Sequence, residues 1–323
     1  MRQQGEDFIS WFIRLFENKA DYGLTCEDIA SLLNEDQGTD YSESKWRKDF
    51  KMFNKGREYE RKLRFGSVEN RILCLSDQHV PFQLPASTFA KYCGRIDTLV
   101  LNGDIADCQA ISKFPKTYRV SPMDELIEAR QYMIDLIEVI QPKEVVVIYG
   151  NHDIRFQSYM ARSLDSDILE LMPQTSLELI CIDGFHHYNK RSRTKVYYPP
   201  LTEVLDEVKI TYVDNWYAQI GDTIFCHPIA FSTGIMKTAD KAVDYFRNAG
   251  IVFKNLVMAH THRVGFYKEG STTMYEQGCC CDVKKCHYAD GKLTAPQKEG
   301  YIYLGQDING NTIAESVDLV SLN

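Results

Sequence analysis

The sequence lacks long hydrophobic runs. Its first apolar stretch, residues 8–16, is interrupted by Arg14 and followed by Glu17, which excludes a membrane span of about 20 apolar residues and the apolar region of a signal peptide. The composition is not that of a disordered chain either, because 44% of the 323 residues are hydrophobic and 25% are charged. We therefore expect a globular cytoplasmic protein with one large domain and a smaller one.

The ten cysteines lack the paired C-x-x-C spacing of structural zinc sites. Five are scattered among strand and helix patterns, where we expect reduced thiols that act as small core residues: Cys74, Cys93, Cys108, Cys181 and Cys226. The run Cys279-Cys280-Cys281, followed by Cys286 and His287, has an additional zinc site as its functional interpretation. That site is disfavoured, because adjacent cysteines rarely project toward one tetrahedral centre.

Histidine is scarce, with eight residues, yet most of them belong to an ordered series of polar clusters. Each cluster lies at or just after a short apolar run typical of a buried strand: residues 72–75, 99–101, 145–148, 224–225 and 256–258. The clusters are Asp77-Gln78-His79, Gly103-Asp104, Gly150-Asn151-His152-Asp153, His227 and His260-Thr261-His262. Loops at strand ends converge in an α/β protein, so the clusters are expected to share one pocket.

The residue types in this pocket suit two hard or borderline divalent cations, which prefer carboxylate, amide and neutral imidazole over thiolate. Two ions about 3.5–4 Å apart hold both oxygens of an in-line displacement and lower the pKa of a shared water toward about 7. Asp104 is the natural bridge between them. The alternative of satisfied core residues and helix caps is disfavoured, because five of the eight histidines follow the series.

The ordered series resembles that of the calcineurin-like metallophosphoesterases over roughly residues 70–265. The resemblance implies ligands for a first ion (Asp77, His79, Asp104, His262) and for a second (Asp104, Asn151, His227, His260). It implies that His152 stands over the phosphate and protonates or stabilises the leaving oxygen, and that Asp107 orients His152. Two small residues depart from the pattern, because Cys226 and Ala259 replace the glycines that usually precede His227 and His260.

The strand patterns and the resemblance together predict the fold of residues 67–323. We expect an α/β/β/α four-layer sandwich of two mixed β-sheets, flanked by helices over residues 124–140 and 238–249. Short strand patterns after Tyr267 would complete the second sheet, and the Asn309-Gly310 step indicates a hairpin. The resemblance implies a turn at Gln277-Gly278-Cys279.

Residues 1–66 are predicted to form a small all-α helix-turn-helix domain. Residues 8–16 have one apolar helical face, Thr25 and Asp28 approximate a capping box, and Ser42 is the expected cap of a third helix. Residues 1–44 contain three basic and ten acidic residues, a net charge of −7, whereas residues 45–64 contain nine and three, a net charge of +6.

A basic third helix is typical of a nucleic-acid reader, and we expect its cations to face phosphates: Arg47, Lys48, Lys51 and Lys55. The alternative is a solvated face on a packing or dimerisation module. The net charge of −8 and the pI of about 5.6 argue against a uniformly DNA-coating surface.

Residues 154–226 separate the third and fourth clusters and are candidates for a cap that faces the substrate. Arg155 is placed to hold a non-bridging phosphate oxygen through two hydrogen bonds. The stretch 186–198 combines aromatic and basic side chains, which suits bases and a phosphate backbone but also describes an ordinary solvated loop.

Two positions indicate the branch of the family that the chain resembles. Asp153 ends the third cluster where the phosphoprotein phosphatases have Glu, and Cys108 follows Asp107 where they have arginine. The pattern is more similar to nucleases and phosphodiesterases, SbcD-like DNA repair nucleases among them, whose architectures are common in bacteria and phages. A bacterial or phage-infected cell is therefore the expected setting.

We predict that DNA phosphodiesters are hydrolysed by attack of a metal-bridging hydroxide. Two divalent ions are implied, Mn²⁺ first, with Fe, Zn, Mg and Ni as alternatives. The alternative activities are a phosphomonoesterase for phosphoprotein or nucleotide, and a cyclic-nucleotide phosphodiesterase. A non-enzymatic DNA-binding module is disfavoured, because every ligand of the pattern is present.

Overall fold

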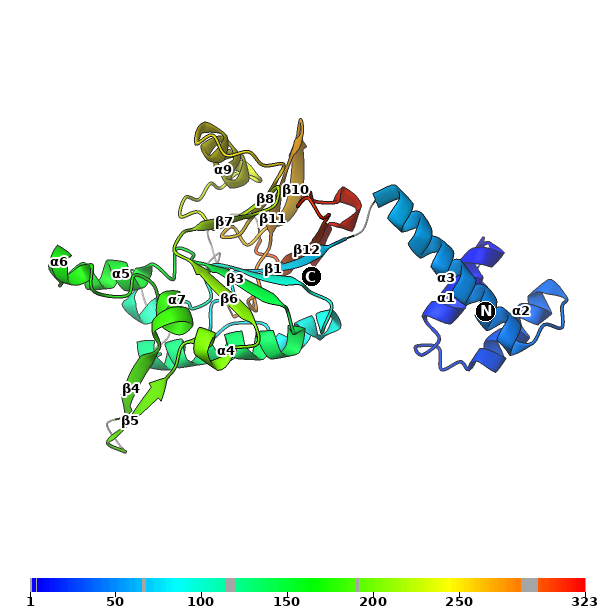
Figure 1. Ribbon diagram of the computed structural model, residues 1–323, viewed down its shortest axis with the longest axis horizontal. Helices are drawn as coiled ribbons and strands as arrows, with labels where there is room; N and C mark the ends of the chain where they lie inside the picture. Colours follow the sequence, from blue (N-terminus) through cyan, green and yellow to red (C-terminus); the bar gives the residue numbers. More distant parts are fainter. Residues whose placement is uncertain are drawn as a thin grey trace. The chain divides into compact units, whose positions relative to one another are not determined.

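The computed structural model describes residues 2–3, 5–65, 68–113, 120–189, 192–285 and 296–322. The chain folds into two compact units, Met1–Ser67 and Val68–Asn323 (Figure 1). No helix among these described residues is long and apolar enough to cross a membrane.

The N-terminal unit is all-α and consists, over its described residues, of α1 (Phe8–Glu17), α2 (Cys26–Gln37) and α3 (Glu43–Phe65). Side chains at each helix start satisfy backbone N–H groups. Thr25 and Asp28 form the predicted capping box of α2, and Ser42 Oγ accepts the N–H of Lys45 at the start of α3. The prediction of a small helical domain is confirmed.

Aromatic side chains from α1 and α3 form the core of this unit. Trp11, Phe12 and Leu15 of α1 are buried together with Ile29 and Leu33 of α2 and with Trp46 of α3. Phe50 stacks on Phe16 with ring centroids 4.7 Å apart. The apolar faces that the sequence predicts therefore turn inward, and the described basic side chains of α3, from Lys45 to Arg57, remain outside.

The larger unit contains two mixed sheets. The first sheet has the order β13 (Asp318–Ser321), β12 (Gly300–Gln306), β1 (Asn70–Leu75), β2 (Thr98–Asn102), β3 (Glu144–Ile148), β6 (Lys209–Val213). The second has the order β10 (Val264–Glu269), β11 (Thr272–Gln277), β9 (Asn255–Met258), β8 (Thr223–Cys226), β7 (Tyr217–Ile220). In the first sheet β1, β2, β3 and β6 run parallel, and in the second β8, β9 and β11 do.

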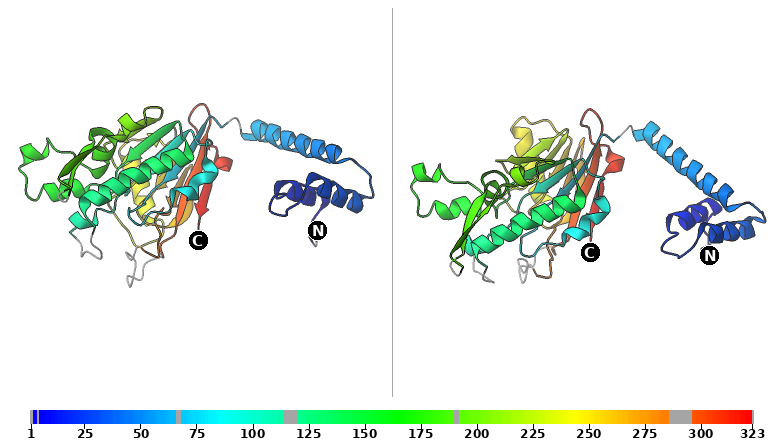
Figure 2. Two further views of the ribbon diagram at one scale, coloured as in Figure 1. Left: turned by 90° about the horizontal axis from the view of Figure 1, so that it is seen from below. Right: turned by 60° about the horizontal axis from the view of Figure 1, so that its bottom comes forward.

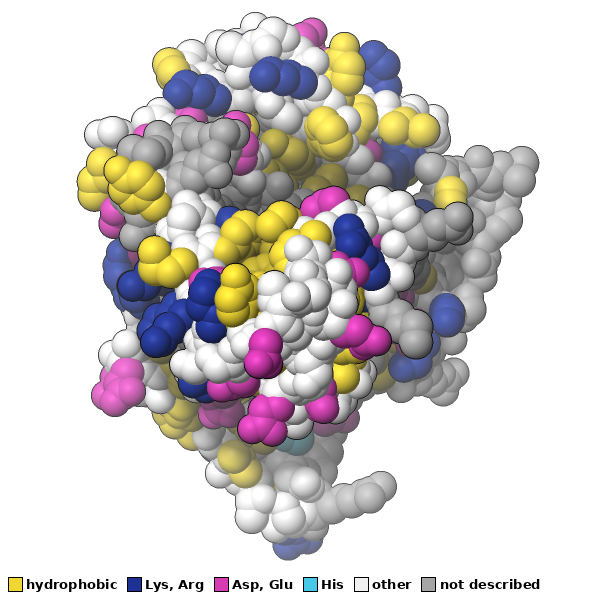
Figure 3. Space-filling model, turned by 90° about the vertical axis from the view of Figure 1, so that its right-hand side faces the viewer, with side chains coloured by type: hydrophobic (Ala, Val, Ile, Leu, Met, Phe, Trp, Pro, Cys, Tyr) yellow, Lys and Arg dark blue, Asp and Glu magenta, His cyan; other side chains and the backbone are white. Residues whose placement is uncertain are grey.

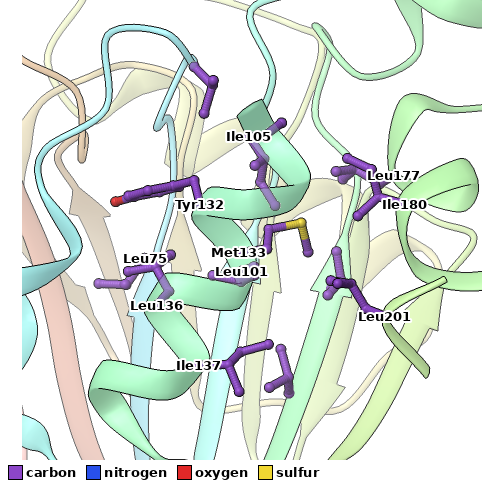
Figure 4. Close-up of a cluster of buried hydrophobic side chains, with 14 of the residues drawn as sticks. Leu75, Leu101, Ile105, Tyr132, Met133, Leu136, Ile137, Leu177, Ile180 and Leu201 are labelled. Atoms are coloured by element: carbon purple, nitrogen blue, oxygen red, sulfur yellow. The ribbon is translucent and has the colours of Figure 1, made fainter. Parts of the chain in front are cut away.

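Alternating side chains bury both faces of the first sheet. Leu73 and Leu75 pack beneath α4 (Pro122–Ile140), where Figure 4 shows Tyr132, Met133 and Leu136 lying over Leu75 and Leu101. The intervening Ile72 and Cys74 face the second sheet.

The outer face of the second sheet packs against α9 (Lys237–Asn248). The four layers α4, first sheet, second sheet and α9 confirm the predicted sandwich. The prediction that the strands after Tyr267 complete the second sheet is correct for β11 but wrong for β12 and β13, because β12 pairs with β1 in the first sheet.

A long insertion joins β3 to β6. Its helical segments are α5 (Arg155–Met160), α6 (Ser166–Leu169), α7 (Ser176–Glu178), the π-helical turn η3 (Leu179–Asp183) and α8 (Leu201–Val204). Between η3 and α8, β4 (Phe185–Asn189) and β5 (Thr194–Tyr198) pair as a separate hairpin that projects from the sandwich in Figure 1 and in the right-hand view of Figure 2. Outside the insertion lie the 3-10 turns η1 (Ala86–Tyr92), η2 (Gln109–Ile111) and η5 (Ala314–Ser316).

Candidate metal centre

The polar clusters lie just beyond the carboxyl ends of five strands, β1, β2 and β3 of the first sheet and β8 and β9 of the second. Asp77, His79, Asp104 and His227 are at most 1% exposed. Ligand atoms within 4.8 Å of one another group Asp77 with His79 and His262, and Asp104 with His227 and His260. The structure thus brings the predicted ligand residues from the whole length of residues 77–262 into one buried site.

Several of these residues have left-handed backbone conformations. The φ angles are 52° for Asp77, 48° for His79, 53° for Asp104, 81° for His260 and 53° for His262. Such conformations cost about 1–3 kcal/mol each outside glycine, and they cluster at functional sites where the surrounding structure enforces them. The loops here turn sharply after each strand, so that successive side chains reach the same pocket.

Two glycines permit the close approach of these loops. A Cβ on Gly103 would lie 2.6 Å from Nδ1 of His227, and one on Gly150 would lie 2.2 Å from Oδ1 of Asp104. Neither gap admits a methyl group. Any side chain at these positions would therefore displace the residues of the site itself.

Outward-facing hydrogen bonds orient the imidazoles. Nδ1 of His227 lies 2.7 Å from the carbonyl oxygen of Asn102, and Nδ1 of His79 lies 3.2 Å from Oδ1 of Asp107. A ring that donates through Nδ1 leaves Nε2 as a lone-pair donor to a metal. In agreement, Nε2 of His79 lies 3.1 Å from Nε2 of His262, which itself lies 3.1 Å from Oδ1 of Asp77.

Three inward-facing atoms are buried without a hydrogen-bond partner in the described part of the chain: Asn151 Oδ1, His227 Nε2 and His260 Nε2. His227 Nε2 lies 3.1 Å from Asp104 Oδ2, but the two atoms are not aligned as a hydrogen bond. Buried polar atoms left in this state are costly. A divalent cation would satisfy all three, so the donor set fits a metal site.

Charges within the pocket shift the pKa values of its residues. Burial lowers the pKa of His227, but the carboxylates of Asp104 and Asp77 outweigh burial and raise it to about 9. Burial and the neighbouring His227 lower the pKa of His260 to about 4. The two carboxylates thus favour positive charge at His227, which a bound cation would supply.

His152 stands beside these groups and is held by its neighbours. Nδ1 of its ring lies 2.9 Å from Oδ1 of Asp107. Its backbone N–H donates to Oδ1 of Asp104 over 2.7 Å. Burial raises the pKa of Asp107, but hydrogen bonds from His152 and His79 outweigh it and keep that pKa below its usual range. Nη2 of Arg155 lies 2.8 Å from Nε2 of His152, and its Nη1 donates to the carbonyl oxygen of Asp107.

Three residues to which the sequence analysis assigned no role complete the site. Asp153 accepts the N–H groups of Asp104 and Gly150, and burial followed by the charge of Asp104 raises its pKa to about 7. Glu125 of α4 accepts the N–H of Cys108, and Gln297 lies 2.7 Å from Nδ1 of His262. Asp153 could have been recognised from its place in the third cluster, whereas nothing in the sequence marks the other two.

The predicted nucleic-acid contacts lie on α3 of the N-terminal unit. Arg47, Lys48, Lys51 and Lys55 are exposed and line a shallow groove of about 600 Å³ together with Ser44, Phe50 and Asn54. Figure 3 shows Lys and Arg side chains on this face beside exposed hydrophobic ones, with Asp and Glu side chains among them. The groove is therefore a basic surface with an aromatic floor.

The cysteines divide into two groups. Cys74, Cys108, Cys181 and Cys226 are free and buried as predicted, but Cys93 is exposed, because it lies at the end of η1 on the surface, and that prediction is wrong. Within the second cysteine group, Cys279 and Cys281 lie near His262. Cys286 and His287 lie outside the described residues.

The comparisons with known proteins agree with this site. Residues 70–264 match the family model of the calcineurin-like phosphoesterases. The chain belongs to this family, whose fold implies divalent metal ions and the hydrolysis of phosphate esters. Residues 1–64 match a second model, described as the YonJ N-terminal domain. No curated protein matches the chain.

Similar solved structures include wild-type Vps29 from Entamoeba histolytica in complex with zinc, with 14% identity and a TM-score of 0.37 over 78% of this chain and 99% of that chain. An archaeal phosphodiesterase has 12% identity and a TM-score of 0.36 over 78% and 99% of the two chains. A metallophosphoesterase from Sphaerobacter thermophilus has 12% identity and a TM-score of 0.33 over 78% and 88%.

Proposed function

We propose that this protein is a dinuclear-metal phosphodiesterase that hydrolyses DNA in the cytoplasm of a bacterial or phage-infected cell. The observation that carries the metal site is the set of buried ligand atoms without partners, Asn151 Oδ1, His227 Nε2 and His260 Nε2. The donors are oxygen and imidazole nitrogen, which suits Mn²⁺ as the first candidate among Mn, Fe, Zn, Mg and Ni.

The proposed ligands divide into two sets that share Asp104. Asp77, His79, Asp104 and His262 would hold one ion, and Asp104, Asn151, His227 and His260 the other. Bound divalent ions supply Lewis-acid polarisation of the phosphate and a water of lowered pKa. Since Asp77 and Asp104 are both buried, the protein itself keeps these charges away from solvent screening.

His152 is the proposed proton donor to the leaving oxygen. Asp107 accepts from Nδ1, so Nε2 of His152 is the nitrogen available to the substrate. Arg155 donates to this Nε2 in the structure. A substrate phosphate would replace His152 as the acceptor for Arg155, which would then hold a non-bridging oxygen. The freed Nε2 would first take up a proton from water, while Asp107 stabilises the positive ring, and would then pass that proton to the leaving oxygen.

DNA as the substrate is supported by the basic groove on α3. Its four cations repeat at spacings that place them on one helical face, with Arg47 and Lys48 one turn before Lys51, and Lys51 one turn before Lys55. Such a row suits contacts to a phosphate backbone, which position nucleic acid without reading its sequence.

The decisive experiment is Mn²⁺-dependent hydrolysis of five substrates: bis-p-nitrophenyl phosphate, p-nitrophenyl phosphate, a cyclic nucleotide, single-stranded DNA and double-stranded DNA. The Asp104→Asn variant is the control for contaminating activity. Cleavage of DNA and of the diester that disappears in the variant supports the proposal. Activity confined to the monoester would replace it with a phosphomonoesterase, and activity only on cyclic nucleotides with a cyclic-nucleotide phosphodiesterase.

The role of His152 has its own test. His152→Ala is expected to lose DNA cleavage by roughly 100-fold or more and to retain DNA affinity, because the residue acts on the leaving group. Slower cleavage of DNA with unchanged cleavage of p-nitrophenyl esters, whose leaving groups need no proton, would support protonation. Equal losses on both would contradict it.

A further inference from the structure

A pair of thiols lies beside the metal centre, just past the end of β11. Cys279 and Cys281 each form one isolated β-bridge, to Glu299 and to Gln83, and the chain bends at Cys280 between them. Cys280 packs in the main core beneath α4, whereas Cys279 and Cys281 share the other side with Phe82 and Val283.

The two thiols on this side are grouped with a ligand of the metal centre. One ligand atom each from Cys279, Cys281 and His262 lies within 4.8 Å of the others, and all three residues are buried. Sγ of Cys279 donates to the carbonyl oxygen of Lys298 over 3.2 Å. Adjacent cysteines rarely project toward one centre, but Cys279 and Cys281 are two residues apart and lie in one cluster, near His262.

We propose that Cys279, Cys281 and His262 form a separate site for a soft or borderline metal ion of the zinc class. Two thiolates and one imidazole are three of the four donors of a tetrahedral zinc site, and binding would release both thiol protons. The neighbouring oxygen- and nitrogen-rich pocket prefers harder ions. Two neighbouring sites in the chain would thus prefer different classes of metal ion.

His262 is shared by the proposed thiol site and the proposed dinuclear site, so that metal binding at one affects the other. It belongs to the thiol group and also to the group with Asp77 and His79, where its Nε2 lies 3.1 Å from Oδ1 of Asp77. Its Nδ1 contacts Gln297. An ion held by the thiols therefore either takes Nε2 from the dinuclear set or displaces Gln297 from Nδ1, and both changes weaken what His262 offers the activating ion.

The simpler interpretation is that these thiols only fill space beside Phe82 and Val283. Core packing and metal binding differ in what they require. A packing role makes no use of thiolate chemistry, so a metal added to the protein would give no sulfur-specific signal. A metal role requires both Cys279 and Cys281 but not the equally buried Cys280, which faces the opposite side.

The first test is spectroscopic and does not depend on enzymatic activity. The full chain, stripped of metal and reduced, is titrated with Co²⁺, and thiolate-to-cobalt charge-transfer absorption is recorded in the near ultraviolet. We expect this band in the wild type and in Cys280→Ala, and its loss in Cys279→Ala and in Cys281→Ala. Circular dichroism confirms folding, and Cys279→Ser replaces an alanine variant that fails to fold.

Absence of the band from the wild type, or its persistence in Cys279→Ala, would overturn the site. Cobalt in the Asp, Asn and His pocket gives no thiolate band, so this result is independent of whether that pocket is occupied.

The second test concerns the coupling through His262, which rests on the proposed function. Mn²⁺-dependent diester hydrolysis is measured at increasing Cd²⁺. We expect Cd²⁺ to inhibit the wild type and Cys280→Ala at concentrations at least about tenfold lower than those needed for the Cys279→Ala/Cys281→Ala double variant. Equal sensitivity of all three would refute the coupling. A protein without diesterase activity that still shows the cobalt band would refute the proposed function and leave the thiol site supported.

Discussion

The two units of this protein use polar groups in opposite ways. The N-terminal unit exposes a row of like charges along one helix, Arg47 to Lys55, where solvent and salt screen them. The larger unit buries Asp77, Asp104 and His227 at 0–1% exposure, where each charge must be neutralised by a partner or a cation. Exposed charges can be placed by a helical pattern alone, whereas buried ones require a surrounding structure that satisfies them.

The hydrophobic cores of the two units differ in how far apart in the sequence their residues lie. The N-terminal core is one cluster formed by three neighbouring helices. The larger unit combines clusters from both faces of two sheets, with residues as distant as Cys74 and Ile302 paired in adjacent strands. A single substitution should therefore affect the small unit most strongly.

The largest expected effect is the loss of the N-terminal unit by Trp46→Ala. Trp46 is 6% exposed and its Nε1 donates to Oδ1 of Asn34 over 2.9 Å. Removing the ring should cost about 3–5 kcal/mol, a large share of the stability of a domain this small. Calorimetry should show an early transition for the variant, with the transition of the larger unit unchanged. Met52→Ala, on the same helix but 66% exposed, is the control; a downward shift of both transitions would contradict independent units.

Asp104→Asn should abolish chemistry without affecting the N-terminal unit. Asp104 is buried, lies 3.1 Å from His227 Nε2 and is the proposed bridge between two ions. We expect at least about a 100-fold loss of diester hydrolysis, about 2.7 kcal/mol, with DNA affinity retained. Hydrolysis rate and DNA binding are measured on the same preparation. Parallel loss of both would mean that the metal site, rather than α3, holds the DNA.

The pH dependence of stability should identify Glu125 as a buried acid. Burial, followed by the charge of Asp107, raises its pKa from 4.5 to about 8. The folded protein therefore favours the protonated carboxyl of Glu125. The stability that this protonated carboxyl contributes is fully present below about pH 4.5 and is lost as pH rises through about 8. Between about pH 5 and pH 8 the wild type should lose on the order of 2 kcal/mol more unfolding free energy than Glu125→Gln.

Urea unfolding at the two pH values measures this difference. Glu138→Gln, an exposed glutamate of the same helix, is the control and should follow the wild type. An identical pH dependence for Glu125→Gln and the wild type would show that Glu125 stays ionised in the folded protein.

The smallest expected effect is charge reversal in the groove. Lys48→Glu combined with Lys51→Glu should weaken DNA binding by about tenfold or more and reduce the slope of log affinity against log salt by about 2, because two phosphate contacts are lost. Titrations at several salt concentrations provide both values. Lys19→Glu alters a lysine of the same unit outside the groove and should leave the slope unchanged; an unchanged slope in the double variant would exclude phosphate contacts by α3.

Local patterns in the sequence predicted the elements well. The apolar runs at residues 72–75 and 145–148 lie within β1 and β3, and Thr25 with Asp28 forms the expected capping box. These features depend on neighbours within a few residues. The role of Glu125 could not be predicted from its neighbours in the sequence. It lies on a predicted helix, and it accepts the backbone N–H of Cys108 only because the fold brings α4 beside that residue.

The sequence by itself determined the order of the polar clusters, the strands that precede them and the basic face of α3, because each depends on composition and short-range periodicity. Only the tertiary structure decided which nitrogen of each imidazole faces inward, that five residues have left-handed or otherwise constrained backbones at the strand ends, and that Cys279 and Cys281 share a side with His262. The reason is physical: these properties follow from contacts between loops far apart in the chain, and burial then fixes the hydrogen bonds and pKa values of the groups that meet there.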